Sequence, residues 1–154
     1  MKTTTSKEKI TALKELIIIN NDRYEGYTKA SELVKDADLK TLFTKFASES
    51  KGFSEELKTH IPYSDEKPGD ETTLSGKVFR AWMDIKKALS SDDRKAVLAS
   101  CEFGEDAAKK TYDSVLDDPE GVSGELLQII RTQRSSIQHG HDTVKQLRDS
   151  YKEK

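Results

Sequence analysis

The side chains that first suggest chemistry are glutamates and histidines, because together they can hold a pair of metal ions. In a helical protein such a centre takes one glutamate from each of two helices and a Glu-x-x-His pair from each of two others. The three-residue spacing is needed because it places both ligands on one face of a helix. This sequence contains no Glu-x-x-His pair: Gly52 stands three residues after Glu49, and Gln138 stands three residues before His141. The spacing therefore argues against a conventional di-iron centre.

Helices must position these side chains, since the apolar residues recur at intervals of three and four and no strand-like alternation of useful length is present. Proline, glycine and helix-capping residues interrupt the pattern at 35–38, 62–70, 90–93 and 117–121. Such residues typically begin or end helices. The sequence predicts helices at about 5–35, 37–61, 73–90, 91–117 and 120–151.

The lengths of the connections predict how these helices are arranged. Short turns make 5–35 and 37–61 antiparallel neighbours, and 91–117 and 120–151 likewise. A helix of about 18 residues at 73–90 would span roughly 27 Å, which is close to the length of the bundle. We therefore expect an all-α, ferritin-like four-helix bundle with a helical crossover between the second and third bundle helices. The alternative is a simple bundle with the short helix across one end. The apolar stripe of that short helix is Val78, Trp82, Ile85 and Leu89.

Composition limits the class of protein. The 154 residues fit a single domain, 1–154, and the 28 acidic and 26 basic residues give no field that favours nucleic acid or an anionic membrane. The longest apolar run, 16–19, is too short for a membrane span or a signal-peptide core. The single cysteine, Cys101, cannot form an internal disulfide, so a reducing cytoplasm is expected. Its side chain is either a small buried apolar group or a reactive thiol.

Helical geometry predicts a polar layer at mid-height of the bundle. Glu105 lies near the apolar seam of its helix and Glu49 on the flank of another, whereas Glu25 and His139 point outward. We interpret the layer as structural, with Glu105 neutralised by Arg134 or Lys51, because a buried charge without a partner costs several kcal/mol. No metal or cofactor is expected. A weakened metal or small-ligand site is the alternative, with Glu49 and Glu105 as the candidate ligands. The predicted layer consists of Asn20, Glu49, Ser50, Glu105, Gln133 and Arg134.

Four segments resemble a known family. They are DRYEGY at 22–27, WMDIK at 82–86, CEFGEDAA at 101–108 continuing to Tyr112, and the stretch from His141 to Asp149. With these motifs the chain resembles the bacterial ferritin-like four-helix-bundle proteins catalogued as a domain of unknown function. The resemblance covers nearly the whole chain and implies a ferritin-like fold. It implies no activity, because the family has none to transfer.

No motif for nucleophilic catalysis or phosphate binding is present: there is no Cys-x-x-Cys, no glycine-rich phosphate loop and no Gly-x-Ser-x-Gly. We expect a non-enzymatic cytoplasmic protein that acts by self-association or by binding a protein partner, with stress physiology as one context. The alternative is a ferritin-like metalloprotein, an oxidase or a metal store, holding iron or another divalent metal in an incomplete ligand set. Arginines in 120–151 suggest nucleic-acid binding only weakly, since a solvated helix face explains them. Exposed aromatic candidates for an interface are Tyr63, Phe103 and Tyr151.

Overall fold

The computed structural model describes residues 2–61, 94–117, 122 and 124–150, and this part of the chain is all-α. It contains four helices: α1 (Lys2–Leu33), α2 (Ala37–Lys58), α4 (Arg94–Asp117) and α5 (Gly124–Ser150). The four long helices expected from the sequence are therefore confirmed. The expected helix at 73–90 lies outside the described residues, as do Tyr63 and Tyr151. None of the described helices combines the length and the apolarity needed to cross a membrane.

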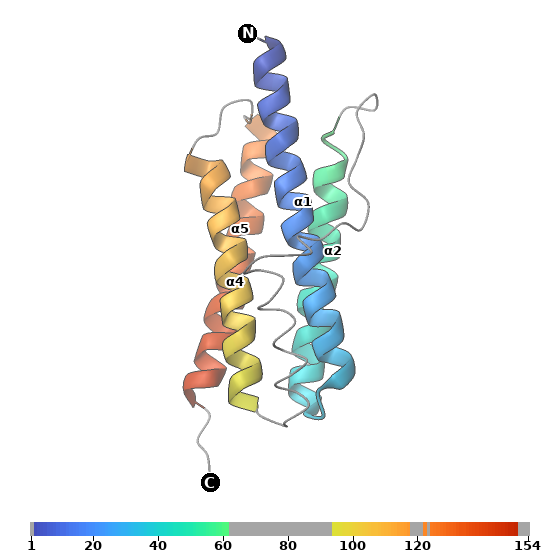
Figure 1. Ribbon diagram of the computed structural model, residues 1–154, viewed down its shortest axis with the longest axis vertical. Coiled ribbons are helices and arrows are strands. Elements are labelled where there is room, and N and C mark those ends of the chain that lie inside the picture. The colour runs from blue at the N-terminus through green and yellow to red at the C-terminus, as the bar shows by residue number, and fades with distance from the viewer. Residues whose placement is uncertain (1, 62–93, 118–121, 123, 151–154) are drawn as a thin grey trace.

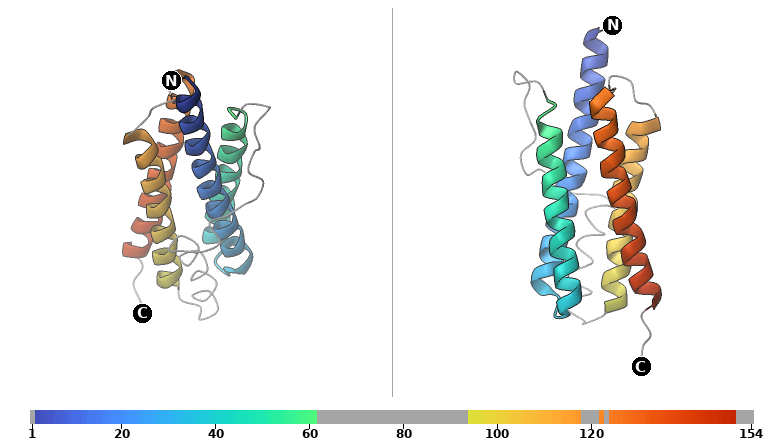
Figure 2. Two further views of the ribbon diagram at one scale, coloured as in Figure 1. Left: turned by 45° about the horizontal axis from the view of Figure 1, so that its top comes forward. Right: turned by 180° about the vertical axis from the view of Figure 1, so that it is seen from behind.

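The helices form two antiparallel hairpins, α1 with α2 and α4 with α5, and α1 also packs against α4 (Figure 1). Seen from behind, α2 and α5 lie on the face opposite α1 and α4 (Figure 2). In Figure 1 α1 and α5 run downward while α2 and α4 run upward, so α2 and α4 share a direction. The end of α2 and the beginning of α4 consequently lie at opposite ends of the bundle.

An ion-pair cluster joins the beginning of α4 to the turn between α1 and α2. Arg94 contacts Asp36 through Nη1, and its Nη2 lies 3.0 Å from Oδ2 of Asp38. Asp36 precedes the first residue of α2, yet its carboxylate makes no capping hydrogen bond to that helix, since Arg94 binds it instead. The side chain expected to cap a helix therefore ties the two hairpins together.

The core consists of two apolar clusters at different heights, and charged and polar side chains separate them. The lower core, nearer the α1–α2 turn, contains Tyr27, Ala30, Val34, Leu39, Phe43, Phe46, Ala47, Val97, Leu98, Cys101 and Val144. The upper core contains Leu13, Leu16, Ile17, Ile19, Leu57, Ile61, Ala108, Tyr112, Val115, Val122, Leu126, Ile130 and Ile137.

Candidate functional site

A fully buried arginine occupies the level between the two cores. Arg23 of α1 makes a two-pronged contact with Glu105 of α4: Nε donates to Oε1 at 2.6 Å, and Nη2 donates to Oε2 at 2.9 Å. Neither side chain is exposed to solvent. A planar guanidinium matches a carboxylate in this geometry, so both groups are charged and hydrogen-bonded at once.

The remaining donors of the guanidinium reach α2. Nη1 donates to Oε1 of Glu49 at 2.9 Å, to Oγ of Ser50 at 2.8 Å and, at a longer 3.4 Å, to the carbonyl oxygen of Phe46. One side chain of α1 therefore binds α2 and α4 together. We call Arg23, Glu49, Ser50 and Glu105 the central ion-pair cluster.

Aromatic rings of the lower core close one side of this cluster. The hydroxyl of Tyr27 donates to Oε2 of Glu105 at 2.9 Å. The guanidinium carbon of Arg23 lies 5.4 Å from the ring centroid of Tyr27 and 5.2 Å from that of Phe46. Such distances allow cation–π attraction, which is strongest where water is excluded.

The surroundings of the Arg23 guanidinium keep it charged. Burial by itself would lower the pKa of the Arg23 guanidinium, but the negative charge of Glu105, helped by their hydrogen bond and by Tyr27 and Glu49, raises it overall. Burial, followed by the charge of Glu105, raises the pKa of Tyr27 well above its usual value. Arg23 therefore stays protonated and Tyr27 stays neutral near neutral pH.

A second polar network lies within the upper core. Asn20 Nδ2 donates to the hydroxyl of Tyr112 at 2.7 Å, and that hydroxyl donates to Oε1 of Gln133 at 2.6 Å. Gln133 in turn donates through Nε2 to Oε1 of Glu56 at 2.8 Å. This network runs through α1, α4, α5 and α2 in that order, so every described helix supplies one member.

The predicted polar layer is divided between these two levels. Glu49, Ser50 and Glu105 meet at the central cluster, whereas Asn20 and Gln133 belong to the upper network. The residue of α5 that faces Glu105 is Gly140, seven positions from Gln133 and therefore about 10 Å further along the helix. A Cβ atom on Gly140 would lie 2.3 Å from Oε2 of Glu105 and 2.8 Å from Nη2 of Arg23, so the absence of a side chain makes room for the ion pair.

The cation that neutralises Glu105 differs from the two we expected. Arg134 pairs instead with Asp113 near the surface, its Nε lying 2.9 Å from Oδ1. Lys51 is exposed, with Nζ 5.6 Å from the ring centroid of Tyr24. Arg23 was not identified from the sequence, although it lies three residues after Asn20 and four before Tyr27, the spacing of a buried helical stripe.

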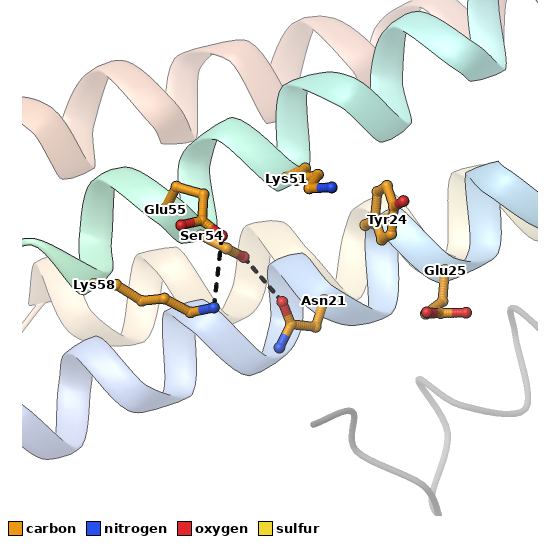
Figure 3. Close-up of a pocket in the computed structure, with 7 residues that line it drawn as sticks. All are labelled: Asn21, Tyr24, Glu25, Lys51, Ser54, Glu55 and Lys58. Atoms are coloured by element: carbon orange, nitrogen blue, oxygen red, sulfur yellow. Dashed lines mark hydrogen bonds and ion pairs between the residues drawn. The ribbon is translucent and has the colours of Figure 1, made fainter. Parts of the chain in front are cut away.

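A shallow surface pocket of about 260 Å³ lies between α1 and α2 (Figure 3). Two charged residues of its lining pair with each other: Nζ of Lys58 lies 3.7 Å from Oε1 of Glu55. Ser54 donates through Oγ to Oδ1 of Asn21 at 3.1 Å. No residue of its lining is a nucleophile beside a base, so the pocket has no arrangement for catalysis. Its polar lining suits at most a small polar ligand. Its lining consists of Asn21, Tyr24, Glu25, Lys51, Ser54, Glu55 and Lys58.

Cys101 lies in the lower core and is fully buried, which confirms the first of its two expected roles. Burial, followed by the nearby charge of Glu105, raises the pKa of the thiol well above its usual value. Because the thiolate is the reactive form, we expect no labelling of the native protein by a disulfide reagent and one thiol per chain after denaturation. An Ala99→Cys variant is the control, since Ala99 is exposed on the same helix and the added thiol should label in the native state. Equally fast labelling of both thiols would contradict this expectation.

Fold and site together define an all-α bundle with a charged, hydrogen-bonded centre. The family model described as "Domain of unknown function (DUF2383)" matches residues 8–118, which is more than half of the chain. The chain therefore belongs to this family. The match includes Arg23, Glu49, Ser50 and Glu105, whereas Gly140 and the rest of α5 lie beyond it. No curated protein and no solved structure matches the chain.

Proposed function

We propose that this protein is a ferritin-like bundle that acts without catalysis, by self-association or by binding a protein partner in the cytoplasm. The observation that supports this is the position of Arg23. Its guanidinium lies between Glu49 and Glu105, the two carboxylates that the sequence offers as metal ligands, and hydrogen-bonds to both. A cation already held by both carboxylates opposes a second, divalent cation at the same place. A central metal store or oxidase is therefore the weaker proposal.

The direction of the helices supports the ferritin-like connection. Arg94 at the beginning of α4 lies beside Asp36 and Asp38 in and after the α1–α2 turn, while α2 ends 22 residues later at Lys58. A helix of that length covers about 33 Å. The end of α2 and the beginning of α4 therefore lie at opposite ends of the bundle, as they do in ferritin-like folds, where one long crossover joins them.

The surface supports an interface on α4. Phe103 is 50% exposed and is the one large apolar side chain with such exposure among the described residues. Full burial of a phenylalanine side chain contributes about 1.5–3 kcal/mol, so covering the exposed half of Phe103 would contribute about half of that in each chain. We therefore propose that the chain self-associates through the exposed side of α4 that carries Phe103.

Light scattering coupled to size-exclusion chromatography tests this self-association at several protein concentrations. We expect the mass to rise with concentration and Phe103→Ser to raise the dissociation constant about tenfold or more, since 1.4 kcal/mol corresponds to tenfold. Ser48→Ala, at an exposed position on α2, serves as the control and should leave the constant unchanged. A strict monomer at every concentration that also retains no partner in pull-down experiments would contradict the proposal.

A further inference from the structure

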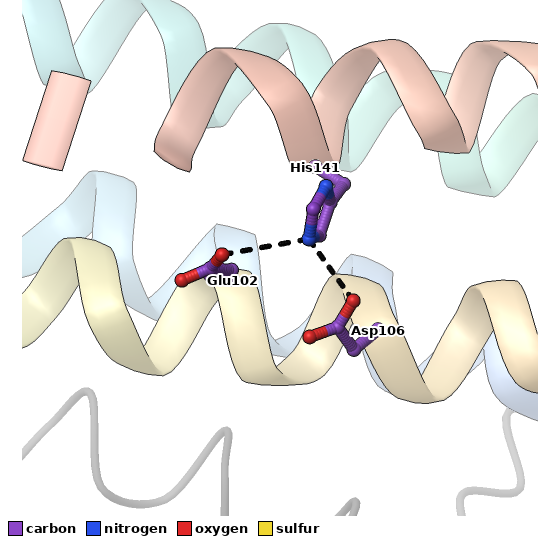
Figure 4. A group of neighbouring side chains, drawn as sticks. All are labelled: Glu102, Asp106 and His141. Atoms are coloured by element: carbon purple, nitrogen blue, oxygen red, sulfur yellow. Dashed lines mark ion pairs between the residues drawn. The ribbon is translucent and has the colours of Figure 1, made fainter. Parts of the chain in front are cut away.

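A second group of ionisable side chains lies between α4 and α5, away from the central ion-pair cluster (Figure 4). Glu102 and Asp106 stand four residues apart on α4, so they share a face of the helix, and His141 of α5 points toward both. Nε2 of His141 lies 3.0 Å from Oδ1 of Asp106 and 3.5 Å from Oε2 of Glu102. The imidazole is almost fully buried, with 9% of the residue exposed, while the Asp106 side chain is 45% exposed. The group is thus ordered by packing on one side and open to solvent on the other.

The orientation of the imidazole is set from its far side. Nδ1 of His141 lies 3.0 Å from Oδ1 of Asp142, and the same oxygen accepts a hydrogen bond from Nε2 of Gln138 at 2.9 Å. Metal-binding histidines are typically held in this way, with one ring nitrogen donating to a carboxylate so that the other presents its lone pair. In that tautomer Nε2 faces two carboxylate oxygens, and three acceptors converge on one point. A cation at that point would interact favourably with all three acceptors.

The three acceptor atoms lie within 4.8 Å of one another, close enough for one small divalent cation to contact all of them after small side-chain movements. Zinc bonds to nitrogen and oxygen ligands at about 2.0–2.2 Å, so ligand atoms around a tetrahedral ion lie roughly 3.3–3.6 Å apart. The separations of 3.0 and 3.5 Å from Nε2 approach this range without movement of a helix. Arg148 contacts Oε1 of Glu102 through Nη1, and Nζ of Lys109 lies 3.9 Å from Oδ1 of Asp106. Each of these cations holds one carboxylate only, whereas Arg23 bridges both carboxylates of the central ion-pair cluster.

We propose that Glu102, Asp106 and His141 form a binding site for a divalent metal of the zinc class, with one coordination position open to solvent. Imidazole nitrogen and carboxylate oxygen are both zinc ligands. The site joins α4 to α5 and is separate from Glu49 and Glu105. It goes beyond the proposed self-association and does not depend on it.

Zinc titration of the chelator-treated, tag-free full chain, followed by calorimetry, tests the site. We expect one equivalent to bind, and His141→Ala to weaken binding by more than about 100-fold. Asp142→Asn should weaken it roughly 10–100-fold, as is usual for a carboxylate that orients a metal-binding histidine. His139→Ala is the matched control, because His139 is exposed on the same helix, two residues away. This control should bind zinc as the unaltered protein does.

Two further measurements separate binding from folding and from self-association. Asp106→Asn removes a ligand at a side chain that is 45% exposed, so it should abolish tight binding while the far-ultraviolet circular dichroism stays unchanged. The visible spectrum of the cobalt-loaded protein should show the intense bands of tetrahedral coordination and lose them in this variant. Phe103→Ser should keep the full zinc affinity even if it disrupts self-association. No zinc binding, or equal binding by the His141→Ala and His139→Ala variants, would overturn the site.

Discussion

Replacing Arg23 by methionine is expected to lower the free energy of unfolding by about 3–5 kcal/mol, the usual cost of removing one partner of a buried ion pair. Methionine retains much of the apolar volume, so the loss comes mainly from the charge. Glu105 would remain fully buried with the hydroxyl of Tyr27 still donating to it, and Ser50 would lose its hydrogen bond to the guanidinium. Because domains of this size are typically stable by about 5–15 kcal/mol, urea denaturation should show a large fall in the midpoint at an unchanged slope.

The matched control for this prediction is Arg134→Met. Arg134 makes the same two-pronged contact with a carboxylate of α4, Asp113, at 2.9 and 3.1 Å, but near the surface. Exposed ion pairs contribute about 0–1 kcal/mol, so this variant should remain close to the unaltered protein. The double variant Arg23→Met with Glu105→Leu should recover part of the loss, since it removes the buried charge of Glu105 as well. Similar losses for Arg23→Met and Arg134→Met would show that burial of the central pair carries no special energy.

Gly140→Ala is expected to destabilise the protein by about 1–3 kcal/mol, the usual cost of overpacking a core. This is opposite to the ordinary effect, since alanine stabilises a helix interior by about 0.8–1 kcal/mol relative to glycine. The added methyl group would lie 2.3 Å from Oε2 of Glu105 and 2.8 Å from Nη2 of Arg23, so the ion pair would have to move. Both side chains are fully buried and hydrogen-bonded to each other, which makes that movement costly.

Gly52→Ala provides the control of opposite sign. Gly52 is an exposed residue within α2, and a Cβ atom there would meet nothing within 4 Å. Thermal or urea denaturation should show a gain of about 0.5–1 kcal/mol for this variant. If both alanine variants stabilised the protein equally, the ion pair could shift without loss and our account of Gly140 would be wrong.

The sequence predicted the seams of α4 and α5 well and those of α1 and α2 less well. On α4 the spacing of three and four predicts a stripe of Val97, Cys101, Gly104, Ala108 and Tyr112, and all five residues are buried. On α2 the same spacing predicts a stripe through Leu42 and Phe53, but the buried stripe passes through Phe43 and Ser54. Both paths obey the spacing of three and four, so the period cannot distinguish them. The choice depends on where the neighbouring helices lie.

Arg23 escaped prediction for a related reason. Between Asn20 and Tyr27 the buried stripe of α1 can pass through either Arg23 or Tyr24, since both keep the spacing of three and four residues. Arginine is almost never fully buried unless it is paired. The apolar choice, Tyr24, is in fact only half-buried. The partner that permits burial of Arg23 is Glu105, 82 positions away. Such a pairing is tertiary information that no local pattern contains.

The sequence contains a signal for the proposed metal site, namely the alignment of positions on α4 with positions on α5. Tyr112 faces Gln133, and the pair of positions sums to 245. In an antiparallel hairpin the facing pairs keep this sum, so His141 faces position 104, between Glu102 and Asp106. Facing positions lie at equal distances in sequence from the middle of the turn. The turn near Val122 therefore predicts this alignment by itself. His141 stands eight residues beyond Gln133, about 12 Å along the helix from the predicted polar layer, so ligands at mid-height do not include it.

The contact between Arg94 and the α1–α2 turn gives the two ends of the molecule different sensitivities to acid. Since α2 and α4 share a direction, the positive ends of two helix dipoles meet there together with the Arg94 cation. Asp36 and Asp38 supply the opposing charge, and the hydrogen bond from Arg94 to Asp38 lowers the pKa of that carboxyl. A lowered carboxyl pKa stabilises the fold above the unfolded value and loses that contribution as the pH falls through the folded value. When the pH falls below 3.8 and through this lowered value, Asp38 loses its charge and its bond to Arg94 weakens, so the bundle should loosen first at the α1–α2 turn.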